Sequence, residues 1–312
     1  MHTQKKILVI KHGSFGDLIL ATGAMKSISN FFPDHNIYIL TESKYQEFIS
    51  HAPFVKNILC DDREPISKLY KNFFLIKKIV DLNFEYIFDL QNSLRTSFYN
   101  GILRFFTSCK ISSSKRFSHY RYHIPLQGTE HVITGLNNQL ALTGIDKFSQ
   151  PSVDWLNDEN FSCDISNPFV ILIPGTSPKG IKKRWMPENY ALISKYLINN
   201  NYNVVVVGTE EDMISASPIF KLCPETINLL GKSPPKILFN LAKRAKFIIS
   251  NDTGPAILSA LSNTTLLWIV NDNSVSKANI PIGNDVIKIS SNSINDISVE
   301  KVKNVLIHKK LI

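Results

Sequence analysis

A short polar stretch near the C-terminal third of the chain, residues 250–261 (SNDTGPAILSAL), has the composition of a phosphate-binding turn. An apolar run over residues 245–249 predicts a buried strand before it, and an apolar helix begins directly after it. Unpaired amides at a helix N-terminus carry about half a positive charge, which suits the phosphates of a ligand. The turn holds three residues of N-cap type, Asn251, Asp252 and Thr253. Gly254 permits close backbone approach, and Pro255 fits a first helical turn. An ordinary strand-to-helix turn explains the stretch equally well.

A second loop, residues 174–185 (PGTSPKGIKKRW), follows another apolar run and gathers hydroxyls and cations. Such groups suit a diphosphate, which develops negative charge when it leaves a sugar. The relevant side chains are Thr176, Ser177, Lys179, Lys182, Lys183 and Arg184. A solvated basic loop is the alternative interpretation.

Acidic side chains follow two further apolar runs. In residues 208–212 (GTEED), Glu210 and Glu211 are candidates to accept hydrogen bonds from a ribose diol, although a surface acidic turn is the simpler interpretation. In residues 12–17 (HGSFGD), the glycines lack the spacing of a dinucleotide fingerprint. Asp17 is either a helix cap or a carboxylate that takes a proton from a substrate hydroxyl. His12 has the same two options, a proton acceptor or a structural histidine.

The elements that must position these loops alternate regularly between short apolar runs and amphipathic segments. This pattern predicts two α/β domains, each with a doubly wound and mostly parallel sheet. Turn-type composition over residues 146–167 places the linker there, which gives domains 1–150 and 151–312. The expected strands are 6–10, 37–41, 58–60, 86–90, 169–173, 204–207, 227–229, 247–249, 265–270 and 286–289, and the longer expected helices are 17–30, 66–83, 131–143, 187–199, 235–245 and 298–309.

Two regions give no clear structural signal. The order blurs over residues 109–127, where basic residues alternate with aromatic ones, as in a substrate groove or a solvated loop. Asp61 and Asp62 are adjacent and are expected in a surface loop, so they do not form a DxD-type metal pair.

Composition restricts the class of protein. The 312 residues include 35 Lys and Arg against 26 Asp and Glu, a net charge of +9, which fits an anionic membrane surface or a phosphorylated substrate. The basic residues are spread along the chain without a nucleic-acid motif, so nucleic acid is not an expected partner. Four dispersed cysteines argue against a zinc site or disulfide framework and fit a reducing cytoplasm. Neither a signal peptide nor a membrane span is expected.

Several segments occur in the order found in the heptosyltransferase family, glycosyltransferase family 9, which the sequence resembles from about residue 6 to residue 270. They are ILVIKHGSFGDLILATGAMKSI, FDLQNSLRTS, IPGTSPKGIKKRWMPENYALI and NLLGKSPPKILFNLAKRAKFIISNDTGPAILSAL. The resemblance implies the GT-B fold, in which two Rossmann-like domains face each other across a cleft, the first binding the acceptor and the second the nucleotide-sugar donor. It further implies inverting transfer of a sugar, typically from ADP-heptose to a lipopolysaccharide core, without a metal or cofactor.

The resemblance also assigns roles to the loops. The catalytic base falls on Asp17 and the phosphate-binding lysine on Lys183, while the loop hydroxyl is Thr176 or Ser177. The backbone of Thr253 and Gly254, beside Pro255, would hold the donor diphosphate, and Asp252 would shape that turn or touch the sugar. One position departs from the family, because Ile257 stands where a histidine is usual and cannot donate a hydrogen bond.

Residues of the N-terminal half are expected to bind an anionic glycolipid or oligosaccharide acceptor. The candidates are His12, Gly13, Arg95, Arg116 and Arg121, with Lys115 as a further cation. This expectation places the enzyme in the cytoplasm, either free or at the inner face of the membrane. Two alternatives remain open: a GT-B transferase that uses another nucleotide sugar for a different glycan, and a family member that binds nucleotide sugar or glycolipid without turnover.

Overall fold

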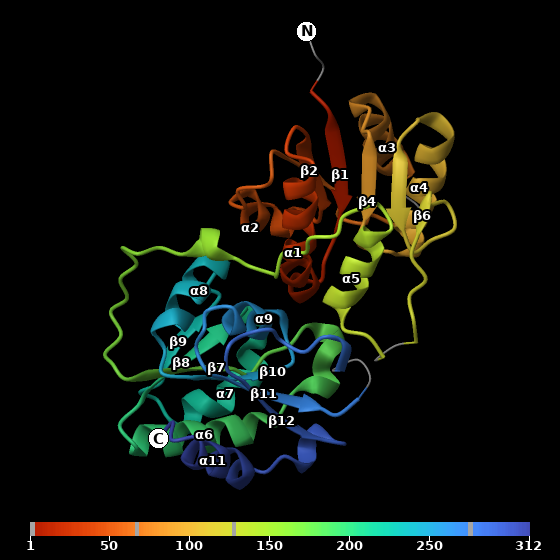
Figure 1. Cartoon of the computed structure of the whole chain (residues 1–312). Helices are drawn as coiled ribbons and strands as arrows, with labels where there is room; N and C mark the ends of the chain where they lie inside the picture. The colour runs from red at the N-terminus through yellow and green to blue at the C-terminus, as the bar shows by residue number, and fades with distance from the viewer. Residues whose placement is uncertain (1–3, 66–68, 127–128, 274–276) are drawn as a thin grey trace. The chain divides into compact units, whose positions relative to one another are not determined.

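The computed structural model describes residues 4–65, 69–126, 129–273 and 277–312 (Figure 1). Strands and helices alternate along this part of the chain and form two compact units. Of the described residues, the first unit comprises 4–65, 69–126 and 130–155, and the second comprises 129, 156–273 and 277–312. No helix in the described ranges is long and apolar enough to cross a membrane.

The first unit contains a six-stranded sheet with the order β3-β2-β1-β4-β5-β6, in which every pairing is parallel. Helices α1 and α5 pack together, as do α3 and α4. The strands are β1 (Lys6–Ile10), β2 (Asn36–Thr41), β3 (Asn57–Cys60), β4 (Tyr86–Asp89), β5 (Lys110–Ser113) and β6 (Tyr120–Arg121); the helices are α1 (Phe15–Phe31), α2 (Gln46–Ser50), α3 (Leu69–Leu82), α4 (Leu94–Phe106) and α5 (Val132–Ala141).

The second unit contains a six-stranded parallel sheet with the order β12-β11-β10-β7-β8-β9. Its strands are β7 (Phe169–Ile173), β8 (Asn203–Gly208), β9 (Ile227–Leu230), β10 (Ile248–Asn251), β11 (Leu266–Asn271) and β12 (Val286–Ser291). Its helices are α6 (Pro187–Asn199), α7 (Met213–Leu222), α8 (Pro235–Arg244), α9 (Gly254–Ala260) and α11 (Val299–His308), with short 3₁₀ turns η4 (Pro178–Lys183) and η5 (Glu210–Asp212).

The central strands are continuous apolar runs because helices cover both faces of each sheet. Residues 7–10 of β1 and all five residues of β7 are buried. In each sheet the chain first winds to one side and then returns to wind to the other, so the strand order reverses between β1 and β4 and between β7 and β10. Ligands of doubly wound sheets bind outside the carboxyl ends of the strands at this point of reversal. The loops after these four strands are therefore the places to look for a site.

The α/β class and the parallel sheets agree with the sequence prediction. Residues 109–127, for which the sequence left a substrate groove and a solvated loop open, contain β5 and β6. The signal was weak because β5 has the sequence KISS, with one apolar side chain, and β6 is two residues long at the sheet edge. The start of the helix expected at residues 66–83 falls on residues 66–68, which lie outside the described ranges.

Candidate active site

A lysine and an aspartate meet at the point where the strand order of the second sheet reverses. Lys183 is the last residue of η4, in the loop after β7, and Asp252 directly follows β10. Their side chains form an ion pair with 2.6 Å between Lys183 Nζ and Asp252 Oδ2. The aspartate side chain is 8% exposed and that of the lysine 39%. The two loops that the sequence singled out separately are thus joined by a direct contact, and the lysine side chain remains partly exposed.

Asn251, the last residue of β10, connects the end of β10 to the loop after β7 through side-chain hydrogen bonds. Its side-chain amide donates to the carbonyl of Pro174 at 2.7 Å, and its Oδ1 accepts from the Trp185 amide at 3.0 Å and the Tyr190 hydroxyl at 3.1 Å. Burial raises the pKa of Tyr190 well above its ordinary value, so this hydroxyl stays protonated and remains a donor. The sequence marked Asn251 only as a residue of N-cap type. Its bridging role depends on partners more than sixty residues away, which local patterns do not reveal.

Replacing Asn251 with alanine should lower the free energy of unfolding by about 2 to 4 kcal/mol, because buried donors and acceptors on both loops lose their partner. Urea unfolding followed by tryptophan fluorescence measures this loss. Asn228→Ala is the matched control, since that side chain accepts a single bond from the amide of Leu230. Equal destabilisation by the two variants would contradict the bridging role.

The hydroxyls after β7 have different environments. Thr176 is buried, and its Oγ1 accepts from Arg184 Nε at 2.9 Å while its carbonyl accepts from Arg184 Nη2 at 2.7 Å. Ser177 is exposed at the start of η4. Arg184 therefore holds the shape of the loop through Thr176, and Ser177 is the hydroxyl left open to a ligand. The side chains of both predicted residues lie in the Lys183 loop.

The turn after β10 has the form expected from its sequence. Thr253 is the N-cap of α9, whose first turn contains Gly254 and Pro255, and the amides of Ala256 and Ile257 donate to the Thr253 carbonyl at 3.1 and 3.3 Å. The helix is only seven residues long. Ile257, which stands where the resemblance to the family implies a histidine, is buried among the core residues.

The acidic turn after β8 separates into exposed and buried carboxylates. Glu210 and Glu211 are exposed, whereas Asp212 is buried and accepts from the amide and hydroxyl of Thr209 at 2.9 and 3.0 Å. A Cβ at Gly175 would lie 2.1 Å from the Asp212 carboxyl group, so this glycine permits the close approach of the two loops. The sequence did not single out Asp212, and the local signal for it was Gly175, two positions after the end of β7.

Asp17 occupies the first turn of α1, after the carboxyl end of β1. Its Oδ2 accepts from the amide and the hydroxyl of Ser14 at 3.1 and 3.0 Å, which makes it part of a capping box. Oδ1 takes no part in this cap, and the residue is half-buried. Asp17 therefore has the structural role that the sequence allowed, while one carboxylate oxygen remains for other chemistry.

Lysine and glycine residues beside Asp17 shape its surroundings. Lys11 is buried and its Nζ donates to the carbonyl of Leu90 at 3.2 Å; burial lowers the pKa of Lys11, while the charges of Asp17 and Asp89 oppose that effect. Gly13 has φ of +140°, and a Cβ there would lie 2.6 Å from the Tyr45 ring. Sequence reasoning missed Lys11, although a lysine that directly continues a buried strand was a visible signal.

Asp61 is not in a solvated loop, contrary to the sequence expectation. It lies after β3 and is buried, with its Oδ2 2.9 Å from His12 Nε2 and 2.9 Å from the hydroxyl of Tyr99. Burial alone would raise the pKa of Asp61, but the hydrogen bond and charge of His12, with further bonds from the Arg63 amide and Tyr99, lower it overall. Burial also raises the pKa of Tyr99 to about 12, so Tyr99 is the donor. The contact between His12 and Asp61 joins the loop after β1 to the loop after β3.

Asp61→Asn should flatten the fall of stability in acid. A carboxyl whose pKa is lower in the folded than in the unfolded chain adds stability above its unfolded pKa of about 3.9 and loses it as the pH falls through the folded pKa. Urea unfolding between pH 3 and pH 6 should show this steep decline below about pH 4 in the original protein and a weaker decline in the variant. Asp34→Asn, at an exposed site, should behave like the original protein. Parallel curves for all three proteins would contradict the assignment.

The residues predicted to bind the acceptor do not all lie in one cluster. The ring of His12 is fully buried against Asp61. Arg95 binds Asn72 Oδ1 at 3.0 Å, the Tyr99 hydroxyl at 2.8 Å and the carbonyl of Glu64, so its guanidinium belongs to the same internal cluster. Arg116 and Arg121 are exposed in and beside the β5–β6 connection. Of the three arginines, these two present their charge to solvent.

Comparison with known proteins shows the family to which this chain belongs. The model of glycosyltransferase family 9 (heptosyltransferase) matches residues 73–305. The chain belongs to glycosyltransferase family 9. It is therefore a glycosyltransferase, as its resemblance to the family implied.

Named relatives of this glycosyltransferase share low identity over most of their length. Lipopolysaccharide heptosyltransferase 3 of Escherichia coli is 23% identical over 275 residues, which cover 81% of this chain and 79% of the relative. The lipopolysaccharide core heptosyltransferase OpsX of Haemophilus influenzae is 21% identical over 283 residues, covering 85% of this chain and 78% of the relative.

Solved structures establish the fold of the glycosyltransferase as GT-B. The E. coli ADP-heptose lipopolysaccharide heptosyltransferase II superposes with a TM-score of 0.79 at 19% identity, covering 98% of this chain and all of the other. The E. coli heptosyltransferase WaaC with ADP-2-deoxy-2-fluoro heptose gives a TM-score of 0.75 at 15% identity, covering 97% and 99% of the two chains. The two doubly wound units of this chain are the two domains of that fold.

Proposed function

We propose that this glycosyltransferase moves a heptose from ADP-heptose to a lipopolysaccharide-core-type acceptor, with inversion at the anomeric carbon and without a metal ion. The observation that carries the proposal is the ion pair between Lys183 and Asp252 where the strand order of the second sheet reverses. This is where a doubly wound domain binds a nucleotide. Asp252 holds the ammonium group of Lys183 in place at this point.

The second unit would bind the donor diphosphate. Lys183 and the free hydroxyl of Ser177 come from one loop, and the Thr253 and Gly254 amides come from the other. Together they would neutralise charge that builds on the diphosphate oxygens as the bond to the sugar breaks. Asp252 orients the lysine and Asn251 holds the two loops in register. Glu210, exposed after the neighbouring strand β8, is the candidate partner of the ribose.

The first unit would activate the acceptor. Asp17 would take the proton of the acceptor hydroxyl, whose oxygen then forms a bond to the anomeric carbon as the bond from that carbon to the diphosphate oxygen breaks. A single displacement of this kind inverts the configuration. Oδ1 of Asp17 is the oxygen available for the proton, since Oδ2 is occupied by the α1 cap.

The identity of the sugar and acceptor is supported by the relatives. Those described above are lipopolysaccharide heptosyltransferases, and the WaaC structure contains an ADP-heptose analogue. The exposed Arg116 and Arg121 would attract an anionic acceptor at the inner face of the membrane.

A panel of nucleotide sugars tests the proposal. Release of the nucleoside diphosphate should be fastest with ADP-heptose and a deacylated core acceptor, and should be unchanged by EDTA. Turnover only with another nucleotide sugar would overturn the assignment of the donor. Loss of turnover in EDTA that Mg²⁺ restores would overturn metal independence, and absence of turnover with every donor would overturn catalysis of sugar transfer by this chain.

A further inference from the structure

Helix α4 of the first unit carries its apolar residues on the side that faces solvent. Leu94, Phe98 and Phe105 are 84%, 60% and 83% exposed. With Gly101 they follow the spacing i, i+4, i+7 and i+11, so they form one stripe along the helix. The opposite side of α4 is the buried one and consists of Thr96, Tyr99, Asn100 and Leu103. The exposed apolar stripe is therefore a different face of α4 from the one that packs against the rest of the unit.

The stripe continues onto the connection between β5 and β6. A Cβ at Gly101 would lie 3.2 Å from the ring of Phe117, so this partly exposed ring covers the glycine between Phe98 and Phe105. Arg104 donates to the carbonyl of Phe117 at 3.4 Å and holds the connection against the helix. Leu94, Phe98, Phe105 and Phe117 are called the α4 face below.

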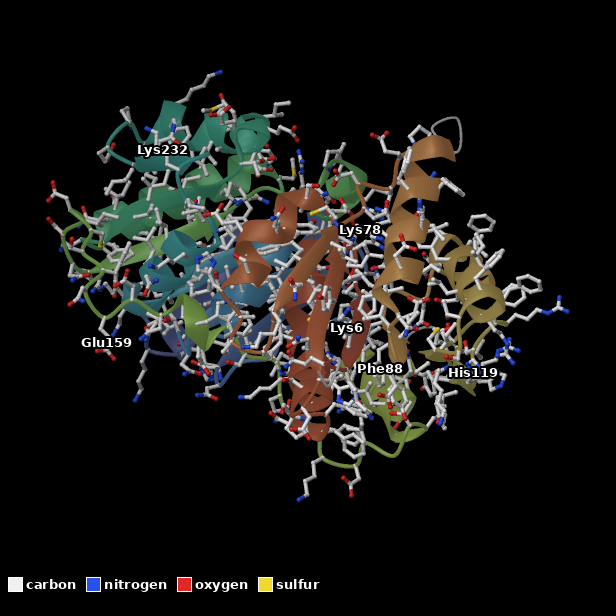
Figure 2. The ribbon with its side chains drawn as sticks, turned by 90° about the horizontal axis from the view of Figure 1, so that it is seen from above. Lys6, Lys78, Phe88, His119, Glu159 and Lys232 are labelled. Atoms are coloured by element: carbon white, nitrogen blue, oxygen red, sulfur yellow. The ribbon has the colours of Figure 1, made fainter. Side chains whose placement is uncertain are left out.

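The segment of the chain that carries the α4 face has charged side chains of one sign only. Residues 90–129 contain no Asp or Glu, although the chain has 26 of them, and they contain six basic residues: Arg95, Arg104, Lys110, Lys115, Arg116 and Arg121. Of these, Arg104, Lys110, Arg116 and Arg121 are exposed. Figure 2 shows α3, which carries Lys78, and the connection that carries His119 on the same side of the first unit as α4. Exposed aromatic and aliphatic side chains among basic residues match the requirements of an anionic lipid interface.

We propose that the α4 face is a membrane-docking surface that inserts its rings among anionic lipids while the surrounding Arg and Lys contact headgroups. A nucleic acid would use the basic charge and could stack on the rings, but it would leave the aliphatic Leu94 exposed. A neutral protein partner would cover the apolar stripe but would not account for the absence of acid across residues 90–129. An anionic bilayer satisfies both features at once. The inference adds a location to the proposed membrane contact and depends on neither the donor sugar nor the base.

Sedimentation with vesicles tests this surface. The full chain should bind phosphatidylglycerol/phosphatidylcholine vesicles, bind pure phosphatidylcholine vesicles much more weakly, and be released by salt. Phe98→Ser with Phe105→Ser should weaken binding to the anionic vesicles at least about tenfold, because each ring loses its burial in the interface. Arg104→Gln with Lys110→Gln should weaken it by about fivefold or more per charge.

Leu192→Ser with Ile214→Ser is the matched control, since these side chains are 50% and 79% exposed on helices of the second unit. That variant should bind vesicles as the original protein does. Release of ADP with a soluble deacylated acceptor should be the same for the original protein and the Phe variant. If the original protein binds vesicles but releases no ADP, the proposed function is wrong and the docking surface stands.

Three results would overturn the docking surface. One is unchanged vesicle binding in the Phe98/Phe105 variant. Another is equal loss of binding in the Leu192/Ile214 control, since this would make the contact a general one. The third is binding of a single-stranded oligonucleotide, weakened by the Phe variant, in a protein that does not bind vesicles.

Discussion

Replacing Asp17 with asparagine should lower the rate constant for sugar transfer by about a thousandfold, because general-base catalysis contributes about 10²- to 10⁴-fold. Asparagine retains an oxygen that can accept from Ser14, so the α1 cap should largely survive. The affinity for the donor should change little, since the residue belongs to the unit that would bind the acceptor. Single-turnover kinetics, with donor binding measured by calorimetry, separates these two quantities.

Asp62→Asn is a close control for this experiment. Asp62 lies in the same unit and also accepts from the amide and hydroxyl of one serine, Ser43, at 2.7 Å each, although it uses both carboxylate oxygens where Asp17 uses Oδ2 alone. Its transfer rate should stay within about twofold of the original, as expected for an exposed carboxylate outside a catalytic site. A transfer rate in the Asp17 variant that matches this control would remove Asp17 as the base.

Replacing Lys183 with methionine should lower the transfer rate constant by about a hundredfold or more, the usual effect of removing one group that stabilises charge in a transition state. Donor affinity should also fall, because the uncompensated charge of Asp252 would repel the diphosphate. Lys183→Met with Asp252→Asn removes that repulsion and should recover part of the affinity but not the rate. This difference separates the role of the lysine charge from that of the ion pair.

The pair formed by Lys288 and Asp272 provides the control. Its atoms Lys288 Nζ and Asp272 Oδ1 lie 2.9 Å apart in the same unit, and both side chains are partly exposed. Lys288→Met should leave donor affinity and transfer rate near their original values, because an exposed ion pair contributes little. Similar losses in the two lysine variants would contradict a specific role for Lys183.

The sequence located the contact between Lys183 and Asp252 better than the contact between His12 and Asp61, and the reason is topological. Lys183 and Asp252 each follow an apolar run, so the pattern located both at strand ends. The adjacency of β7 and β10 then brings them together, as a doubly wound sheet requires. The strand periodicity and the direction of the strands are enough to predict that the two residues lie close together. They are not enough to predict the geometry of the contact.

Asp61 shows what the sequence could not provide. Its neighbours Asp62 and Arg63 give it the composition of a surface loop, and its partner His12 lies 49 positions earlier in the chain. Burial of such a carboxylate depends on Tyr99 and Arg95 reaching it from α4, which is a property of packing and not of local pattern. The same limit hid Asn251, whose partners Pro174 and Trp185 lie in the segment between β7 and α6 and whose partner Tyr190 lies in α6.

Inverting sugar transfer with Asp17 as the base is tested most directly by following the product of one reaction by NMR. With ADP-heptose and a deacylated core acceptor, we expect a new glycosidic anomeric signal whose configuration is opposite to that of the donor, formed at the rate at which ADP appears, and absent with Asp17→Asn. A product that retains the donor configuration, or ADP release without a new glycosidic signal, would contradict it.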